Sequence, residues 1–273
     1  MKIGIVAGAN SNLYASTLVV RLAAQQDAPA CIILAEEPAW RRLAAHVRVA
    51  GGRATLRKLA RHYDVGGLPD RDARHYLREY ATGRGLAGWD SPLTTLAAGT
   101  GARVVRVPSV HDPRATDCVR EHGLDLLINT AGVIFKPALL QASRLGMLNA
   151  HMARLPRFRG MNVLEWSLWF DQPPAVTVHF VTPSIDLGDI LAVRDIPVAR
   201  DDTISTLRSK SYAVMVEAMA ECIAALREGR ETRTPQRPEE GKQYFVMHPA
   251  LARLVEARLA ASKTALFARR TLG

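Results

Sequence analysis

The sequence is poor in features that would place it in several protein classes. Its three cysteines, Cys31, Cys118 and Cys222, are odd in number, far apart and without the spacing of a metal site. No apolar run approaches the roughly 20 residues that span a bilayer. Residues 1–6 lead directly into an apolar segment without the pattern of a signal peptide. We therefore expect a cytoplasmic protein whose cysteines are small core residues in a reducing compartment, rather than a disulfide-stabilised or membrane protein.

Acidic residues are fewer than basic residues in this chain. The 273 residues include 36 lysines and arginines against 26 acidic residues, which gives a formal net charge of +10. Hydrophobic content of 48% and charged content of 23% are typical of a soluble globular protein. The length predicts one large domain, or one domain with an appendage. The positive charge favours anionic partners, although arginines that merely solvate helix faces would explain it more simply.

The stretch from Gly146 to Gly160 contains the most informative polar residues. Its first part is short and apolar, which predicts a strand. Residues two apart on a strand project to the same face, so Asn149 and His151 should lie side by side. An amide can donate a hydrogen bond to a developing oxyanion, and an imidazole can transfer a proton near neutral pH. The alternative is that both are satisfied structural polar groups at a strand end.

A second predicted strand, residues 176–181, is followed by an acidic loop. Asp186 stands in this loop, and Gly188 permits a tight backbone path there. A carboxylate at this position could orient an imidazole or accept a proton. The two stretches together predict a site for acid–base chemistry.

The amino-terminal region predicts a strand, a small polar loop and a helix over residues 12–26. A loop that leads into a helix N-terminus is a common anion site, because unpaired N–H groups and the helix dipole converge there. The alternative, which we favour, is that Ser11 or Asn12 simply caps the helix.

Other segments complete an α/β pattern. Strand, helix and strand at this spacing predict a parallel sheet with helices on its faces. Further strands are predicted over 30–34, 102–107, 124–129 and 244–246, and further helices over 113–122, 161–170, 203–227 and 248–269. Residues 228–241 have the composition of a polar, proline-containing linker.

Four motifs occur in an order that is typical of one enzyme family. They are Asn-Ala-His at 149–151, Leu-Pro-Arg-Phe-Arg-Gly at 155–160, Val-Thr-Val-His-Phe at 176–180 and Asp-Leu-Gly-Asp-Ile-Leu at 186–191. Through these motifs the chain resembles the folate-dependent formyltransferases, closely over residues 124–202 and more loosely over residues 1–34. The resemblance implies a doubly wound, mostly parallel, Rossmann-like α/β sheet. It also implies transfer of a formyl group from 10-formyltetrahydrofolate to an amine.

The resemblance assigns roles to individual residues as well. The implied catalytic residues are Asn149, His151 and Asp186. The loop at 131–137 resembles the family segment whose backbone holds the pterin ring, and the implied folate-binding residues are Gly132, Val133, Ile134, Phe135, Ile185 and Asp186. The implied acceptor-binding residues are Ser11, Asn12, Arg159, Met161 and Asn162. Residues 8–13 resemble the phosphate-binding turn of glycinamide ribonucleotide formyltransferases, with Ala9 and Asn10 as departures. No metal is implied.

The domain organisation follows from the same comparison. We expect a catalytic domain over residues 1–210, a helical insertion at about 36–100 and a helical C-terminal extension over 211–273. Methionyl-tRNA formyltransferases usually carry a larger, β-rich C-terminal domain, so we expect the amine of a small molecule as acceptor rather than nucleic acid, and no membrane partner.

Two other functional classes are compatible with the sequence. One is a hydrolase that releases formate from the same folate by using water as the acceptor. The other is an RNA-binding or methionyl-tRNA formyltransferase-like protein on the same scaffold. The sequence also leaves open the identity of the acceptor, the role of the insertion and whether the chain forms a homodimer.

Overall fold

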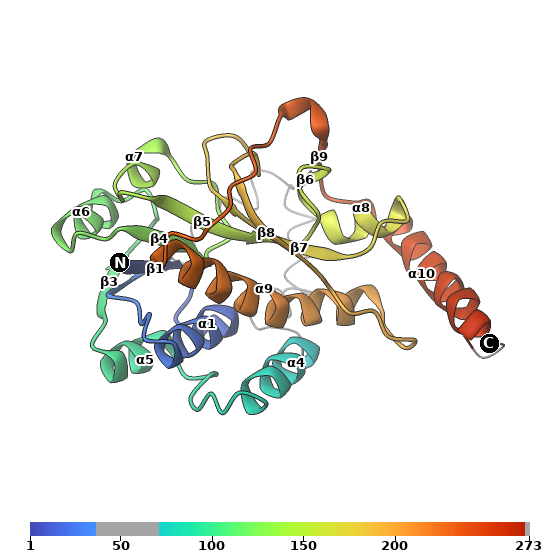
Figure 1. Ribbon diagram of the computed structural model, residues 1–273, viewed down its shortest axis with the longest axis horizontal. Helices are drawn as coiled ribbons and strands as arrows, with labels where there is room; N and C mark the ends of the chain where they lie inside the picture. The colour runs from blue at the N-terminus through green and yellow to red at the C-terminus, as the bar shows by residue number, and fades with distance from the viewer. Residues whose placement is uncertain (37–70, 271–273) are drawn as a thin grey trace, which may run out of the picture. The chain divides into compact units, whose positions relative to one another are not determined.

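The computed structural model describes residues 1–36 and 71–270 (Figure 1). It divides into two compact units, one drawn from Met1–Asp70 and Ala81–Met147 and the other from Arg71–Tyr80 and Leu148–Gly273. Residues 37–70 of the predicted insertion lie outside the described residues, whereas residues 71–100 are described and contain the helices α4 (Arg71–Thr82) and α5 (Leu93–Thr100). The predicted division at residue 210 falls within the helix α9 (Ile204–Arg227). Among the described helices, none has the length and apolar character needed to span a membrane.

The first unit is built on parallel strands in the order β3-β2-β1-β4. Strands β1, β2 and β4 are buried along their whole length, as their apolar sequences predict. The strands are β1 (Ile3–Ala7), β2 (Cys31–Ala35), β3 (Arg103–Val107) and β4 (Leu126–Asn129), and the helices are α1 (Leu13–Ala24), α5 (Leu93–Thr100), α6 (Pro113–Glu121) and α7 (Pro137–Leu140). This unit supplies the α/β pattern that the strand and helix spacing predicted.

Polar caps begin two helices of the first unit. The Asn12 side chain accepts a hydrogen bond from the Ala15 backbone N–H, and the Asp112 side chain accepts one from Arg114. Capping by Asn12 is therefore present, which is the alternative that the sequence favoured. The three cysteines are buried free thiols, as predicted, but Cys31 and Cys118 are not isolated: their Sγ atoms lie 2.9 Å apart.

The second unit is dominated by antiparallel pairing, with β7 between β5 and β8. Helix α9 packs against β7 and β8 (Figure 1), and α8 packs against α10. The elements are β5 (Gly146–His151), β6 (Phe158–Gly160), α8 (Val163–Trp169), β7 (Ala175–Phe180), β8 (Ile190–Asp195), α9 (Ile204–Arg227), a 3-10 turn (Pro238–Glu240), β9 (Lys242–Tyr244) and α10 (Pro249–Arg270), while α4 (Arg71–Thr82) spans the boundary between the units.

The strands follow the order β3-β2-β1-β4-β5-β7-β8, a mostly parallel seven-stranded sheet with helices. The predicted α/β fold class is therefore confirmed. Strand β8 is the main element that the sequence did not predict, because Ile190 and Leu191 had been read as the end of the acidic loop and no element was assigned to residues 192–195.

Candidate active site

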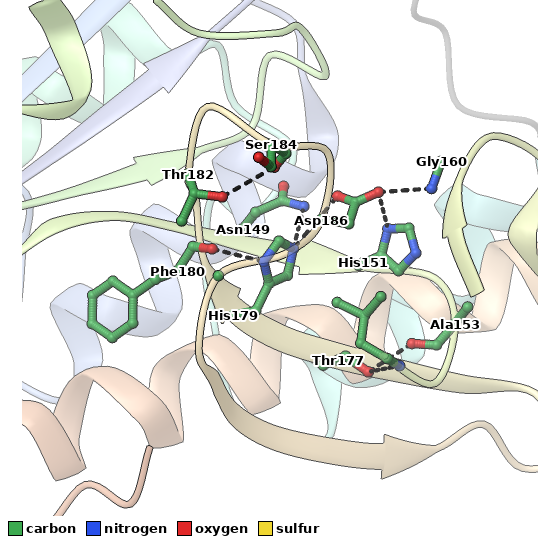
Figure 2. A network of polar contacts seen from close by, with 12 residues as sticks. Asn149, His151, Ala153, Gly160, Thr177, His179, Phe180, Thr182, Ser184 and Asp186 are labelled. Carbon is green, nitrogen blue, oxygen red and sulfur yellow. Dashed lines mark hydrogen bonds and ion pairs between the residues drawn. The ribbon is translucent and has the colours of Figure 1, made fainter. Parts of the chain in front are cut away.

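Two antiparallel strands place the polar residues of the motifs opposite one another. In the register of β5 and β7, Asn149 pairs with His179, and His151 pairs with Thr177. Residues directly opposite each other share a face, and alternate residues on a strand share it too. All four side chains therefore project from one face, as Figure 2 shows. The prediction that Asn149 and His151 lie side by side is confirmed.

His179 is the most buried ionisable residue of this cluster, with 2% of its surface exposed. Its Nδ1 lies 2.8 Å from the Phe180 carbonyl oxygen, which can only accept, so Nδ1 carries the proton. The unprotonated Nε2 then accepts a hydrogen bond of 3.2 Å from the Asn149 amide nitrogen. Burial, followed by the nearby charge of His151, lowers the pKa of His179 to about 4, against a smaller opposing effect of Asp186. His179 is thus a neutral acceptor that fixes the Asn149 amide.

His151 connects the strand to the following loop and to the acidic residue. Its Nε2 donates a hydrogen bond of 2.8 Å to the Phe158 carbonyl oxygen. Its Nδ1 faces the Asp186 Oδ2 at 3.6 Å, close enough for an ion pair when the ring carries a second proton. His151 is 7% exposed. The arrangement lets His151 and Asp186 exchange a proton while the ring orientation stays fixed by Phe158.

Asp186 is the point where the cluster converges. Its Oδ2 accepts a hydrogen bond of 2.8 Å from the Gly160 backbone N–H, and its Oδ1 lies 3.7 Å from the His179 Nε2. Its backbone has a φ of 51°, which is uncommon for a residue with a side chain. A Cβ on Gly188 would lie 1.9 Å from the Phe180 carbonyl oxygen, so only glycine fits the loop there. The loop is therefore built to hold the carboxylate in one place.

Thr177 anchors the loop that follows β5. Its side-chain oxygen donates to the Ala153 carbonyl oxygen at 2.6 Å and accepts from the Leu155 N–H at 3.2 Å (Figure 2). The residue is fully buried. Because this loop leads to Phe158 and Gly160, which bind His151 and Asp186, Thr177 supports both partners of the acid–base pair.

The predicted folate-binding residues divide into exposed and buried groups. Val133, Ile134 and Ile185 are exposed apolar side chains, with 45%, 71% and 37% of their surface accessible, whereas Phe135 is buried. Gly132 has a φ of 63°, and its N–H is directed to the Asn129 side chain at 3.3 Å. Gly132 to Phe135 belong to the first unit, and Ile185 and Asp186 belong to the second.

The predicted acceptor-binding residues are mostly engaged within the protein. The Asn12 side chain also donates to the Thr130 carbonyl oxygen at 2.8 Å, while Ser11 is exposed in the turn before α1. Arg159 is 6% exposed, and its Nη2 donates to two backbone carbonyl oxygens. The Asn162 side chain bonds Glu165 and the Met247 N–H. Met161 is 56% exposed.

His179 was missed as a site residue by the sequence analysis. The available indication was its place two residues after Thr177 on an otherwise apolar strand, but its partner follows only from the pairing register. Among the described residues, no group of three or more histidine, cysteine, aspartate or glutamate side chains is suited to hold a metal ion.

Comparisons with known proteins identify the family of this chain. Residues 79–223, more than half of the chain, match the family model described as formyl transferase. A methionyl-tRNA formyltransferase from a Methylobacterium strain is 32% identical over 66% of this chain and 58% of its own length. One from Nitrosospira multiformis is 31% identical over 56% of this chain and 50% of its own length. The chain spans about half the length of the curated relatives it matches.

Solved structures share the fold at low sequence identity. Glycinamide ribonucleotide transformylase 1 from Symbiobacterium toebii has a TM-score of 0.56 at 18% identity, with 84% of this chain and 89% of that chain covered. Phosphoribosylglycinamide formyltransferase from Anaplasma phagocytophilum has a TM-score of 0.55 at 15% identity, covering 89% and 99%. A sugar 3N-formyl transferase, solved in the presence of dTDP and 5-N-formyl-THF, has a TM-score of 0.52 at 13% identity, covering 95% and 79%. With its family model matched across both strands of the polar cluster, this chain belongs to the formyl transferase family, whose members are enzymes that transfer formyl groups.

Proposed function

We propose that this chain transfers a formyl group from 10-formyltetrahydrofolate to a primary amine, with Asn149, His151 and Asp186 as the catalytic residues. The observation that carries the proposal is the geometry of the polar cluster. An oriented amide and an imidazole–carboxylate pair lie on one face of β5 and β7, inside the region that matches the family. These are the two functions that acyl transfer needs: stabilisation of an oxyanion and movement of a proton.

The reaction begins when the lone pair of the amine attacks the formyl carbon. A new C–N bond forms, and the carbonyl oxygen becomes an oxyanion that accepts a hydrogen bond from the Asn149 amide. His179 keeps this amide oriented, because its Nε2 accepts one of the two N–H groups. Preorganised donors of this kind contribute about 3 to 4 kcal/mol each to stabilisation of the transition state.

Proton transfer completes the reaction. The attacking nitrogen loses a proton to Asp186, directly or through water, and His151 shares that proton through the Nδ1 that faces the carboxylate. The bond between the formyl carbon and the folate nitrogen then breaks, and the folate nitrogen takes up the proton. Because the nucleophile must be a neutral amine, the rate should fall as the amine becomes protonated in acid.

Binding of the folate is assigned to the residues expected from the sequence. In the first unit, the exposed apolar side chains of Val133 and Ile134 suit the face of a flat ring, and the backbone around Gly132 supplies polar groups. In the second unit, the exposed apolar side chain of Ile185 is the contact expected beside Asp186. The sugar 3N-formyl transferase that shares the fold was solved with a formylated folate present, which supports this class of donor.

The acceptor that we propose is the amine of a small molecule. In support, the solved structures that share the fold include a glycinamide ribonucleotide transformylase and a sugar 3N-formyl transferase, both named for small-molecule acceptors. Methionyl-tRNA is the second candidate, because the relatives with about 30% identity are named methionyl-tRNA formyltransferases and the chain carries a net charge of +10.

A transfer assay tests the proposal and separates the candidates. The enzyme is incubated with 10-formyltetrahydrofolate labelled with ¹³C in the formyl group, together with aminoribonucleotides, amino sugar nucleotides or methionyl-tRNA, and products are identified by mass spectrometry. A formylated amine that disappears with Asp186→Ala supports the proposal and identifies the acceptor class. Labelled formate released at the same rate with and without amine would replace it with a hydrolase.

A further inference from the structure

A segment near the C-terminus runs along the loop that carries Asp186. Residues 234–244, here called the strap, begin with an antiparallel bridge in which Thr234 and Ile190 exchange two backbone hydrogen bonds of 2.9 Å. The sequence suggested only a polar linker over most of this segment. The bridge instead ties the start of the strap to the residue that ends the acidic loop.

Gln236 makes the most direct contact between the strap and the acidic loop. Its side-chain nitrogen donates to two backbone carbonyl oxygens of the loop, to Asp186 at 3.1 Å and to Gly188 at 2.5 Å. Its side-chain oxygen is buried and has no hydrogen-bond partner in the described part of the chain. Gln236 is therefore held through its side-chain N–H groups alone, and the hydrogen bonds of these groups go to the acidic loop.

The other end of the strap holds Gly160, whose backbone N–H donates to the Asp186 carboxylate. Strand β9 of the strap pairs in parallel with β6, so that Gly160 lies opposite Tyr244. The Arg159 Nη2 donates to the carbonyl oxygens of Pro238 and Gly241, both at 2.8 Å. Gly160 in turn donates its N–H to the Asp186 Oδ2. One short segment thus positions both the backbone of Asp186 and a donor to its carboxylate.

The strap lies so close to the segment that follows β5 that side chains are excluded at two points. A Cβ on Gly241 would lie 1.8 Å from the Pro156 carbonyl oxygen, and a Cβ on Gly160 would lie 2.2 Å from the Tyr244 carbonyl oxygen. Such contacts between backbones leave the strap little freedom to shift. They fix its distance from the residues that bind His151 and Asp186.

Asp186 has a left-handed backbone conformation that needs support from the residues around it. A left-handed backbone is unfavourable for a residue with a Cβ, and it persists only where the surroundings hold it. We propose that Gln236 is a positioning residue for formyl transfer: through the Asp186 and Gly188 carbonyls it holds the carboxylate against His151 and Gly160. This inference rests on the proposed function, because it concerns the residue to which proton transfer was assigned.

The first test reads the position of the carboxylate without any reaction. The Gly160 amide proton reports its hydrogen bond to Asp186, and its NMR signal in Asp186→Asn marks the state in which that charged acceptor is lost. In Gln236→Met, which keeps the length of the side chain and removes the donor, we expect this signal to move from its wild-type position toward that of Asp186→Asn. An unchanged signal in Gln236→Met would overturn the inference.

Gln243→Met is the matched control. It introduces the same change in the same strap, at an exposed side chain of β9, and should leave the thermal midpoint at its wild-type value. Because the Gln243 side chain lies beside Gly160, this variant measures the effect of a nearby methionine alone, and its Gly160 signal should not move toward that of Asp186→Asn. If Gln236→Met does not fold, Gln236→Asn replaces it, because the shorter amide no longer reaches both carbonyls.

The second test is a double-mutant cycle in kcat. We expect Gln236→Met to lower kcat by about 10- to 100-fold, as small misplacements of reacting groups do, with the dissociation constant of a folate analogue changed less than about twofold. In the Asp186→Asn background the same substitution should lower kcat by less than about twofold, because the carboxylate that Gln236 positions is absent. Losses that multiply would show an independent structural role and overturn the inference. A wild type that transfers no formyl group would refute the proposed function, while the Gly160 signal would still decide whether Gln236 positions Asp186.

Discussion

Acidification should destabilise this protein through His179, by an amount that follows from its burial. The pKa of His179 lies at about 4, mainly because burial disfavours the charged ring. The unfolded chain binds a proton at this imidazole below its ordinary pKa near 6.5, whereas the folded chain does not do so until about pH 4. Above pH 6.5 the ring is neutral in both states, so its titration does not change the free energy of unfolding. As the pH decreases from 6.5 towards 4, the free energy of unfolding falls.

The magnitude is about 2 kcal/mol between pH 7 and pH 5, and about 3 kcal/mol over the full interval. Urea unfolding of the wild type and of His179→Gln at about pH 7, 6 and 5 measures it. His179→Gln keeps a polar side chain but cannot titrate, so the wild type should lose about 2 kcal/mol more than the variant over this range. His248→Gln, which removes an exposed imidazole, is the control for loss of a histidine elsewhere.

The comparison depends on the difference in slope and not on the absolute stability of the variant at neutral pH. Equal losses of stability in the wild type and His179→Gln would refute the argument. So would an NMR titration of the folded protein in which the His179 ring becomes protonated near pH 6.5, because the burial assigned to it would then have no electrostatic consequence.

Three further outcomes are expected from the site. His151→Ala and Asp186→Ala should each lower turnover by at least about 100-fold with the fold intact, measured by steady-state kinetics and circular dichroism; rates near those of the wild type would remove these residues from the mechanism. Gly188→Ala should lower the free energy of unfolding, measured by urea unfolding, by at least about 2 kcal/mol, because its Cβ would collide with the Phe180 carbonyl oxygen. Unchanged stability would contradict the loop geometry. Formyl transfer should decline in acid with the ionisation of the acceptor, so an amine of lower pKa should keep its rate to lower pH; identical profiles for all amines would exclude the neutral nucleophile.

The sequence predicted the parts of the site that depend on local periodicity. Asn149 and His151 share a face because a strand alternates, and this alternation is visible in an isolated segment. Helix α9 was predicted from its apolar spacing, and the structure has it, with Thr203 as the N-cap. The α/β fold class was predictable for the same reason, because apolar segments alternate with helical ones.

The parts that depend on pairing between distant segments were not predictable. His179 becomes a partner of Asn149 only once β5 and β7 pair in one particular register. The polar residues 228–241 suggested a linker, since nothing in their composition indicates that the Gln236 amide reaches two carbonyls of a loop about 50 residues earlier. Contacts of this kind follow from tertiary placement and leave no local pattern.

Binding of the donor is the most direct test of the central claim. Calorimetry with a stable analogue of 10-formyltetrahydrofolate should give micromolar binding to the wild type. Asn149→Ala should still bind within about tenfold, because its amide is assigned to the formyl oxygen and not to the ring; the loss of one neutral hydrogen bond costs only about 1 kcal/mol. Absence of binding to the wild type would contradict the account, because the cluster around Asp186 would then serve a purpose other than formyl transfer from folate.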